Sequence, residues 1–251
     1  MQQFKDAVAL ITGAASGIGA AVATRIANSG ARKLILVDWS EDRLHDFAFS
    51  LPCERALIAG DVADPALWRE ADLTGLTNAV VNAGIASAGP IEGLEFEEWR
   101  RIMSVNLDGA FLTLQAAMRA IRSTGGGSIV LTASAAGVKA ERDIAAYASS
   151  KAAVIQLARV ASKEGASDKI RVNVIAPGGV ETPIWDCVPL FADRASEIGR
   201  EAAFAELAAM ATPLKRYAKP EEIAAQIAFL LSDDCAGVTG TVFISDGGYT
   251  V

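Results

Sequence analysis

Seven short runs of consecutive apolar residues recur along the chain, separated by longer alanine-rich stretches. Val, Ile and Leu dominate these runs, which are hydrophobic throughout instead of alternating with polar residues. Continuous apolar character is typical of parallel strands that helices cover on both faces. We therefore predict strands at 7–12, 33–38, 55–60, 78–83, 128–133, 171–176 and 241–245.

The stretches between these runs favour helices. In residues 145–165, for example, Val154, Leu157 and Ala161 recur at helical spacing and Gly165 provides a stop. Strands that alternate with helices predict an α/β fold with a doubly wound, seven-stranded parallel sheet. No internal repeat or linker interrupts the pattern, so we expect residues 1–251 to form a single domain.

Composition agrees with one large domain and limits its partners. Hydrophobic residues make up 51% of the 251 and charged residues 21%, which is enough for a sizeable core. The formal net charge of −7 argues against nucleic acid or an anionic membrane as a partner. The short polar stretch before the first strand is unlike a secretion signal, and no apolar run is as long as a membrane span. We expect a cytoplasmic protein.

Neither disulfides nor a metal are indicated. Cys53, Cys187 and Cys235 are far apart and form no C-x-x-C pair, so we expect each to be a small, buried, apolar residue with a reduced thiol. The single histidine, His45, lies in an expected helix, where a partly exposed helix face is the simplest interpretation. We predict no metal site.

A glycine-rich turn follows the first expected strand. The sequence TGAASGIG places Gly13, Gly17 and Gly19 before an apolar helix. Glycines here let the backbone turn sharply and approach a pyrophosphate, whose charge the following helix N-terminus stabilises. The G-x-x-x-G-x-G spacing differs from the commonest dinucleotide fingerprint, and a purely structural turn is the alternative.

Asp38 ends the second expected strand, nineteen residues beyond Gly19. An acidic residue there can accept hydrogen bonds from an adenosine ribose and would repel a 2′-phosphate. No arginine or lysine lies between Gly13 and Gly17 or directly after Asp38, where Trp39 stands. The sequence therefore favours NAD over NADP.

A tyrosine and a lysine lie four residues apart in the helical stretch 145–165. One helical turn brings the Lys151 ammonium close to the Tyr147 phenol. A neighbouring positive charge favours the phenolate and moves the phenol pKa toward the range of a general acid or base. A helix face that happens to carry both residues is the other interpretation, so the pair alone is only suggestive.

Taken together, the motifs resemble those of the short-chain dehydrogenase/reductase family over nearly the whole chain. They are T-G-x-x-x-G-I-G, D-V at 61–62, N-A-G at 82–84, S-V-N at 104–106, the serine of TASAAG, Y-x-x-x-K and PGGVET, in that order. Ser134 precedes Tyr147 by thirteen residues, the spacing usual in the family. The resemblance implies seven strands in the order 3-2-1-4-5-6-7.

The resemblance also implies roles for four residues. Tyr147 is expected to be the general acid/base, and Lys151 to lower its pKa and hold the nicotinamide ribose. Ser134 is expected to polarise the substrate oxygen, and Asn106 to anchor a water in a proton relay. Thr182 could accept a hydrogen bond from the nicotinamide carboxamide, or could simply cap a helix. The full set expected at the dinucleotide is Gly13, Ser16, Gly17, Ile18, Gly19, Asp38, Asp61, Val62, Asn82, Ala83, Gly84, Tyr147, Lys151, Pro177, Gly178, Val180 and Thr182.

The chain departs from the family pattern at two places. The segment from Asp61 to Asn82 is shorter than usual, which predicts a trimmed helix around PALWREADL. The common N-N-A-G is VNAG here, with Val81 in place of the first asparagine, while Asn82 is retained. Neither departure affects the expected catalytic residues.

Two segments are expected to shape the substrate pocket. The first, between Ser134 and Tyr147, carries Lys139, Glu141 and Arg142, which could meet a polar substrate or simply be solvated. The second, about 182–213, is rich in apolar residues and suits either a substrate lid or the packing of two short helices. It carries Trp185, Val188, Leu190, Phe191, Phe204 and Met210.

The leading hypothesis is an NAD(H)-dependent oxidoreductase that interconverts a secondary alcohol and its ketone. An NADPH-dependent carbonyl or 3-ketoacyl-thioester reductase is the alternative within the family. A non-catalytic NAD-binding scaffold or sensor is the alternative of another class, although all the expected catalytic residues are present. The family resemblance implies a homotetramer, with a dimer as the alternative. The substrate itself, its stereochemistry and the direction of reaction are left open.

Overall fold

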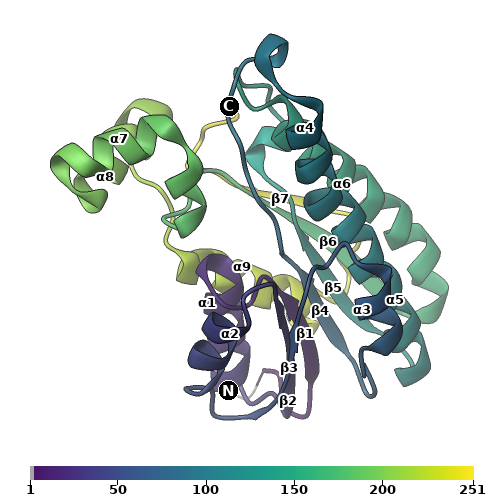
Figure 1. The fold of residues 1–251 in the computed structure, drawn as a ribbon. Coiled ribbons are helices and arrows are strands. Elements are labelled where there is room, and N and C mark those ends of the chain that lie inside the picture. Colours follow the sequence, from purple (N-terminus) through teal and green to yellow (C-terminus); the bar gives the residue numbers. More distant parts are fainter. Residues whose placement is uncertain (1–2) are drawn as a thin grey trace.

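A seven-stranded parallel sheet forms the centre of the computed structural model, which describes residues 3–251 (Figure 1). The strand order is β3-β2-β1-β4-β5-β6-β7, and every neighbouring pair is parallel. The strands are β1 (Val8–Thr12), β2 (Lys33–Asp38), β3 (Glu54–Ala59), β4 (Asn78–Val81), β5 (Gly127–Thr132), β6 (Ile170–Pro177) and β7 (Val242–Ser245). The predicted fold class, strand positions and strand order are confirmed.

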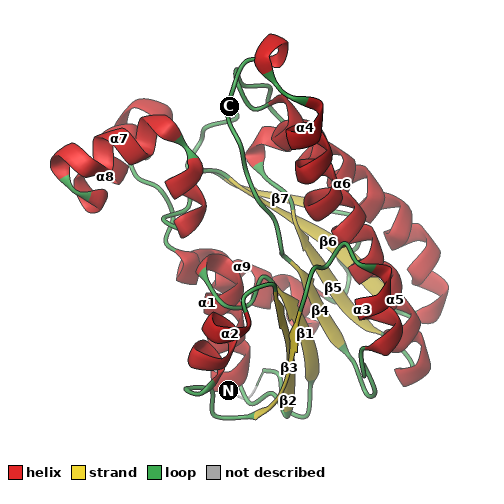
Figure 2. Ribbon diagram, viewed as in Figure 1, coloured by secondary structure: helices red, strands yellow, loops and turns green. Residues whose placement is uncertain are grey.

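Helices cover both faces of the sheet (Figure 2). Alternate residues of β1 explain the two layers, because Ala9 and Ile11 pack with α1, α2 and α9, whereas Val8 and Leu10 pack with α5 and α6. The helices are α1 (Gly17–Asn28), α2 (Glu41–Ala48), α3 (Pro65–Glu70), α4 (Phe96–Met103), α5 (Gly109–Thr124), α6 (Ala145–Gly165), α7 (Pro189–Ile198), α8 (Arg200–Ala211) and α9 (Pro220–Leu231).

The connection between β3 and β4 is short, as expected. Its helix α3 has six residues, begins with Pro65 and is capped by the Asp64 carboxylate, which accepts from the Ala66 amide at 2.7 Å. The Trp68 indole donates to the carbonyl of Val62 at 2.8 Å. This bond ties the trimmed helix to a segment that leaves the carboxyl end of the sheet.

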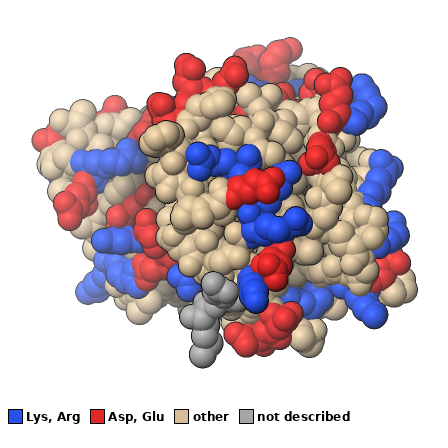
Figure 3. Space-filling view, turned by 90° about the horizontal axis from the view of Figure 1, so that it is seen from below, with Lys and Arg blue, Asp and Glu red and all other residues tan. Residues whose placement is uncertain are grey.

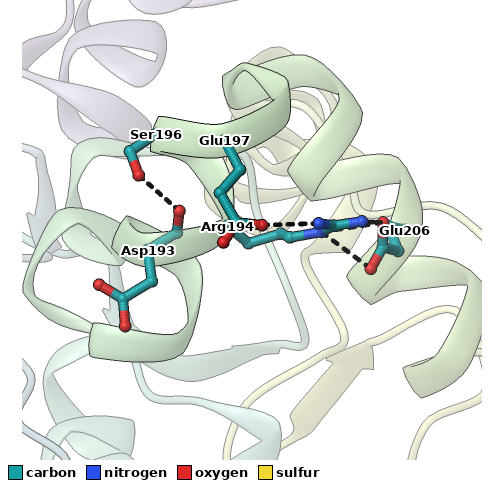
Figure 4. A network of polar contacts seen from close by, with 5 residues as sticks. All are labelled: Asp193, Arg194, Ser196, Glu197 and Glu206. Atoms are coloured by element: carbon teal, nitrogen blue, oxygen red, sulfur yellow. Dashed lines mark hydrogen bonds and ion pairs between the residues drawn. The ribbon is translucent and has the colours of Figure 1, made fainter.

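The helices α7 and α8 form a pair that projects away from the sheet (Figure 1). Arg194 on α7 holds them together, because it donates to both carboxylate oxygens of Glu206 on α8 and also to Glu197 (Figure 4). Beneath this ion pair, the Phe191 and Phe204 rings lie 4.4 Å apart between centroids. The pair therefore has a small core of its own.

The apolar residues singled out in 182–213 have three different environments. Phe191 and Phe204 are buried in the small core of the helix pair, together with Tyr217. Trp185 and Val188 are partly buried against that core and also line the large cavity described below. Leu190 and Met210 are exposed. The helix-packing interpretation is correct for Phe191 and Phe204, whereas the substrate-lid interpretation stays a prediction.

The surface of the protein carries charges of both signs. On the face shown in Figure 3, basic and acidic side chains are interspersed with uncharged surface. None of the described helices is long and apolar enough to cross a membrane. Cys235 is buried as predicted, but the prediction was wrong for Cys187, which is exposed, and Cys53 is only partly buried. Cys187 is exposed because it lies in the short 3-10 helix Pro183–Cys187 beside the cavity.

Candidate active site

A cavity of about 900 Å³ opens at the carboxyl ends of the strands, where parallel sheets bind their ligands. Ser134, Tyr147 and Lys151 line it, together with every expected dinucleotide-binding residue except Gly19. Asn106 does not line the cavity and is 1% exposed. The structure thus brings together residues from seven separate segments that the sequence analysis connected.

The glycine turn has the shape that a diphosphate requires. Gly13 and Gly17 adopt positive φ angles of 64° and 53°, which other residues rarely take. Gly19 packs so tightly on the carbonyl of Gly13 that no side chain fits between them. The Ser16 hydroxyl makes no capping bond to α1, so the amides of the first turn of the helix face the cavity without a side-chain partner. This cradle fits a dinucleotide diphosphate.

Asp38 is held firmly at the end of β2. One carboxylate oxygen accepts from the Ala15 amide at 2.9 Å and the other from the Ser40 amide at 3.1 Å. The side chain lines the cavity although the residue is only 6% exposed. A carboxylate fixed in this way can still accept hydrogen bonds from ribose hydroxyls, because each oxygen has a second lone pair.

Thr12 supports the site from below, a role that the sequence analysis missed. Its buried hydroxyl accepts from the amides of Asn82 at 2.9 Å and Ala83 at 3.1 Å. The Asn82 side-chain amide donates to the Thr12 carbonyl at 3.0 Å. These bonds join the ends of β1 and β4 and fix the N-A-G segment. The signal in the sequence was a threonine at the end of a completely apolar strand.

Tyr147 and Lys151 lie on α6, one turn apart, as predicted. Burial raises the Tyr147 pKa, and a hydrogen bond with Ser134 offsets this in part. Burial lowers the Lys151 pKa to about 8. Its ammonium donates to the Thr132 carbonyl at 2.9 Å and lies 5.7 Å from the centroid of the Tyr147 ring. The expected lowering of the phenol pKa by Lys151 stays a prediction.

Asn106 lies in a π-helical turn, Ser104–Asp108, between α4 and α5. Such a turn rotates a side chain out of the regular helical pattern and is frequent at functional sites. The Asn106 side chain accepts from the Ile85 amide at 2.8 Å and donates to the Ile85 carbonyl at 2.9 Å. It also donates to the Ser150 hydroxyl, which in turn donates to the Tyr147 carbonyl. Asn106 is therefore connected to the tyrosine-bearing helix.

Because Gly84 has no side chain, a small space is left beside Lys151 and Asn106. A Cβ at this position would lie 3.2 Å from Lys151 Nζ and 3.3 Å from Asn106 Oδ1. Both polar atoms thus face the volume that a side chain at position 84 would fill. A water molecule in this volume would have at least two polar partners.

Two basic residues line the cavity unexpectedly. Arg43, in the first turn of α2, lies with its guanidinium carbon 5.4 Å from the centroid of the exposed Trp39 ring. The sequence analysis considered only the position directly after Asp38, whereas a helical turn carries Arg43 back over Trp39. Arg101 on α4 lines the opposite part of the cavity, beside Ser87 and Cys187.

The charged loop before Tyr147 lies outside the lining of the cavity. The Lys139 ammonium donates to the Tyr249 carbonyl at 2.7 Å, and it lies 4.4 Å from the centroid of the Tyr249 ring. Glu141 and Arg142 are exposed and are not among the lining residues either. Thr182 does line the cavity; it begins the 3-10 helix Pro183–Cys187 but forms no side-chain cap, which leaves the cofactor-binding interpretation open.

Comparisons with known proteins define the family. The family model for enoyl-(acyl carrier protein) reductase matches residues 13–250. Cis-4-hydroxycyclohexanecarboxylate dehydrogenase of Sinomonas cyclohexanicum is 35% identical, over 99% of this chain and 98% of its own. Levodione reductase of Leifsonia aquatica is 38% identical, over 98% and 95%. The chain belongs to the short-chain dehydrogenase/reductase family.

A solved structure agrees with this assignment. L-sorbose reductase from Gluconobacter frateurii, in complex with NADPH and L-sorbose, superposes with a TM-score of 0.91. The two sequences are 30% identical, and the match covers 99% of this chain and 98% of the other. The similarity therefore extends over nearly the whole of both chains.

Proposed function

We propose that this protein is an NAD(H)-dependent oxidoreductase that interconverts a secondary alcohol and its ketone. The observation that carries the proposal is the convergence of Ser134, Tyr147 and Lys151 on one cavity that also contains the glycine cradle and Asp38. Family membership supports the class of reaction, since the relatives described above are dehydrogenases and reductases.

Tyr147 would act as the general acid/base. In the direction of oxidation, its phenolate removes the hydroxyl proton of the alcohol, which Ser134 holds by a hydrogen bond to the same oxygen. When bound, the nicotinamide supplies the chemistry of hydride acceptance from the carbinol carbon, or of hydride donation in the reverse direction. With substrate and cofactor bound, the apolar part of the lining would limit the access of bulk water to the reacting groups.

Lys151 and Asn106 would assist proton transfer between Tyr147 and solvent. A charged Lys151 stabilises the phenolate, because opposite charges at short range favour ionisation of both groups. With a pKa near 8, Lys151 can also take up and release a proton close to neutral pH. A water beside Gly84, held by Asn106 Oδ1 and Lys151 Nζ, would continue the path toward solvent.

The cofactor is proposed to be NAD(H) on the strength of Asp38. Its fixed carboxylate suits ribose hydroxyls and would repel a 2′-phosphate. Arg43 is the observation that favours the second candidate, an NADPH-dependent reductase, because it places a guanidinium at the same end of the cavity. Dissociation constants for NADH and NADPH, measured by fluorescence titration, separate the two; tighter NADPH binding would overturn the proposal.

Ring alcohols are the first substrates to test. Cis-4-hydroxycyclohexanecarboxylate dehydrogenase is similar along nearly its whole length, and the cavity of this protein is mainly apolar where Ile85, Val105 and Trp185 line it. The helix pair α7–α8 would act as a lid over bound substrate, since Trp185 and Val188 connect its core to the cavity wall. NADH formation from NAD with ring alcohols, polyols and hydroxy acids tests the reaction class.

A homotetramer is proposed for the assembly, with a dimer as the alternative. Phe96, Phe111 and Val160 expose apolar surface on α4, α5 and α6, and Phe243 and Ile244 do so on the edge strand β7. Two separate apolar surfaces suit two kinds of contact between subunits. Light scattering coupled to size-exclusion chromatography would reject the proposal if it found a monomer.

A further inference from the structure

The part of the cavity that would bind substrate is mainly apolar and contains one charged side chain among the described residues. Beside Ser134 and Tyr147 its walls are formed by the β4–α4 connection, by Val105 and Ile144, and by the 3-10 helix Pro183–Cys187. The charged residues that line the cavity are Asp38, Arg43, Asp61, Arg101 and Lys151. Asp38, Arg43 and Asp61 belong to the cofactor end and Lys151 lies beneath Tyr147. Arg101 is therefore the one charged residue that the described chain places in the substrate wall.

Arg101 is held in a fixed orientation. Its Nε and Nη2 donate to the two carboxylate oxygens of Glu98, each at 2.7 Å. This bidentate bond uses the side edge of the guanidinium. The end edge, formed by both Nη groups, has no hydrogen-bond acceptor among residues 3–251 at Nη1. A planar two-oxygen anion fits that edge.

The β4–α4 connection and the 3-10 helix Pro183–Cys187 meet in the cavity wall that Arg101 also lines. The Cys187 thiol donates to the Ile184 carbonyl at 2.9 Å and to the Ala86 carbonyl at 3.4 Å, so it joins the 3-10 helix to the β4–α4 connection. Partial desolvation raises the pKa of the Cys187 thiol, and the nearby Arg101 charge offsets a smaller part of this. Cys187, Arg101 and Tyr147 all line the same cavity.

We propose that Arg101 selects substrates that carry a carboxylate, and that the substrate is an apolar, ring-sized hydroxy acid or its keto acid. The apolar wall would bind the ring, Ser134 and Tyr147 the carbinol oxygen, and the open edge of Arg101 the carboxylate. This inference rests on the proposed dehydrogenase function and extends it from the reaction to the substrate class. Half of the Arg101 side chain is exposed and Glu98 already pairs with it, so its contribution to affinity is moderate.

The test compares matched substrates and matched variants. The substrates are cyclohexanol and hydroxycyclohexanecarboxylates with the carboxylate adjacent to, one carbon removed from or opposite the hydroxyl, each also as its methyl ester. The variants are Arg101→Gln, Arg101→Lys and, as the control, Arg100→Gln. Arg100 is the preceding residue on α4, is exposed and does not line the cavity, so its substitution makes the same change in charge outside the site.

The expected result is a preference of about tenfold in kcat/KM for at least one acid over its ester, lost mainly through KM in Arg101→Gln. Arg101→Lys should retain part of the preference, whereas Arg100→Gln should retain all of it and leave cyclohexanol turnover unchanged. Equal use of acid and ester by the wild-type protein, or equal effects of Arg100→Gln and Arg101→Gln, would overturn the inference while leaving the dehydrogenase function intact.

A binding measurement covers the case in which none of these alcohols is oxidised. Cyclohexanecarboxylate lacks a hydroxyl and can only occupy the site, so calorimetric titration of the protein saturated with NADH measures recognition of the anion alone. The inference predicts binding that weakens about tenfold in Arg101→Gln and not in Arg100→Gln. No binding to the wild-type protein would contradict it. Absence of turnover together with Arg101-dependent binding would instead count against the proposed reaction.

Discussion

Two cations that line the cavity differ in burial and in pairing. One lies beside Tyr147 at the base of the cavity, which we call the floor, and the other lies in the substrate wall. Lys151, on the floor, is 4% exposed, has no carboxylate partner among the described residues, and has its pKa lowered to about 8 by burial. Arg101, in the wall, is about half exposed and paired with Glu98, which raises its pKa. Burial without a counter-ion turns Lys151 into a group that exchanges protons near neutral pH. Exposure and pairing make Arg101 a permanent charge, suited to recognition.

The largest expected effect is on catalysis by Lys151→Met. Without the ammonium, the pKa of the Tyr147 phenol rises further, and we expect kcat/KM for oxidation at pH 7 to fall about 10²–10⁴-fold. Oxidation needs the phenolate, so its rate should rise with pH, and in the variant this rise should begin at higher pH. Stopped-flow or steady-state profiles of NADH formation measure both. A variant with an unshifted profile would show that Lys151 does not act through Tyr147.

The same substitution should stabilise the fold. Because the folded-state pKa of Lys151 is lowered from 10.5 to about 8, the unfolded protein binds more protons in that pH window, and stability of the wild-type protein rises across it. At pH 7 the free energy of unfolding of Lys151→Met should exceed that of the wild-type protein by about 1–3 kcal/mol. Loss of the hydrogen bond to the Thr132 carbonyl offsets part of this gain. The gain should shrink as the pH rises from about 8 toward 10.5.

Urea denaturation of both proteins at pH 7 and at pH 10 checks this sign. A variant that is less stable than the wild-type protein at both values would mean that the buried ammonium is stabilised by its surroundings, contrary to the comparison drawn here.

Filling the space between Lys151 and Asn106 tests the proton path. Gly84→Ala places a methyl group 3.2 Å from Lys151 Nζ and 3.3 Å from Asn106 Oδ1, and should lower kcat about tenfold or more by displacing a bridging water. Gly89→Ala is the matched control, because a Cβ there meets nothing within 4 Å. Both variants should bind NADH equally. If the two substitutions had the same effect on kcat, the space beside Gly84 would have no part in catalysis.

The smallest expected effect concerns the choice of cofactor. Asp38→Asn removes a charge while keeping the shape, and should shift the ratio of kcat/KM for NAD to that for NADP about tenfold toward NADP, because Arg43 can then attract a 2′-phosphate. Arg43→Gln in the same background should reverse most of the shift. Cofactor titrations on the two variants measure the ratios; a shift that persists without Arg43 would contradict this role.

Local sequence was sufficient to predict the sheet and most of the residues at the base of the cavity. The strands β1, β2 and β4 are almost completely buried and apolar, and the polar residues at their ends, such as Asp38 and Asn82, are positioned by the strands themselves. The Tyr147–Lys151 pair depends only on the geometry of one helix. These features do not require knowledge of how the helices pack.

The wall was not predictable in the same way. Arg101 reaches the cavity because α4 packs against α6, and Arg43 because α2 packs on β2 and β3; Cys187 joins two segments that are 101 residues apart in the sequence. Spacing in the sequence indicates none of these contacts. The rise in the Tyr147 pKa on burial could not be predicted either, because desolvation depends on the residues that surround the phenol in the folded protein.

The most direct test of the account is a comparison of the wild-type protein with Tyr147→Phe. The measurement is NADH formation from NAD and an accepted alcohol, with NADH binding followed by fluorescence on the same samples. We predict that turnover falls at least about 10³-fold while the dissociation constant for NADH stays within about twofold, because the substitution removes only the acid/base hydroxyl. Unchanged turnover in Tyr147→Phe would contradict the assignment of Tyr147 and, with it, the proposed mechanism.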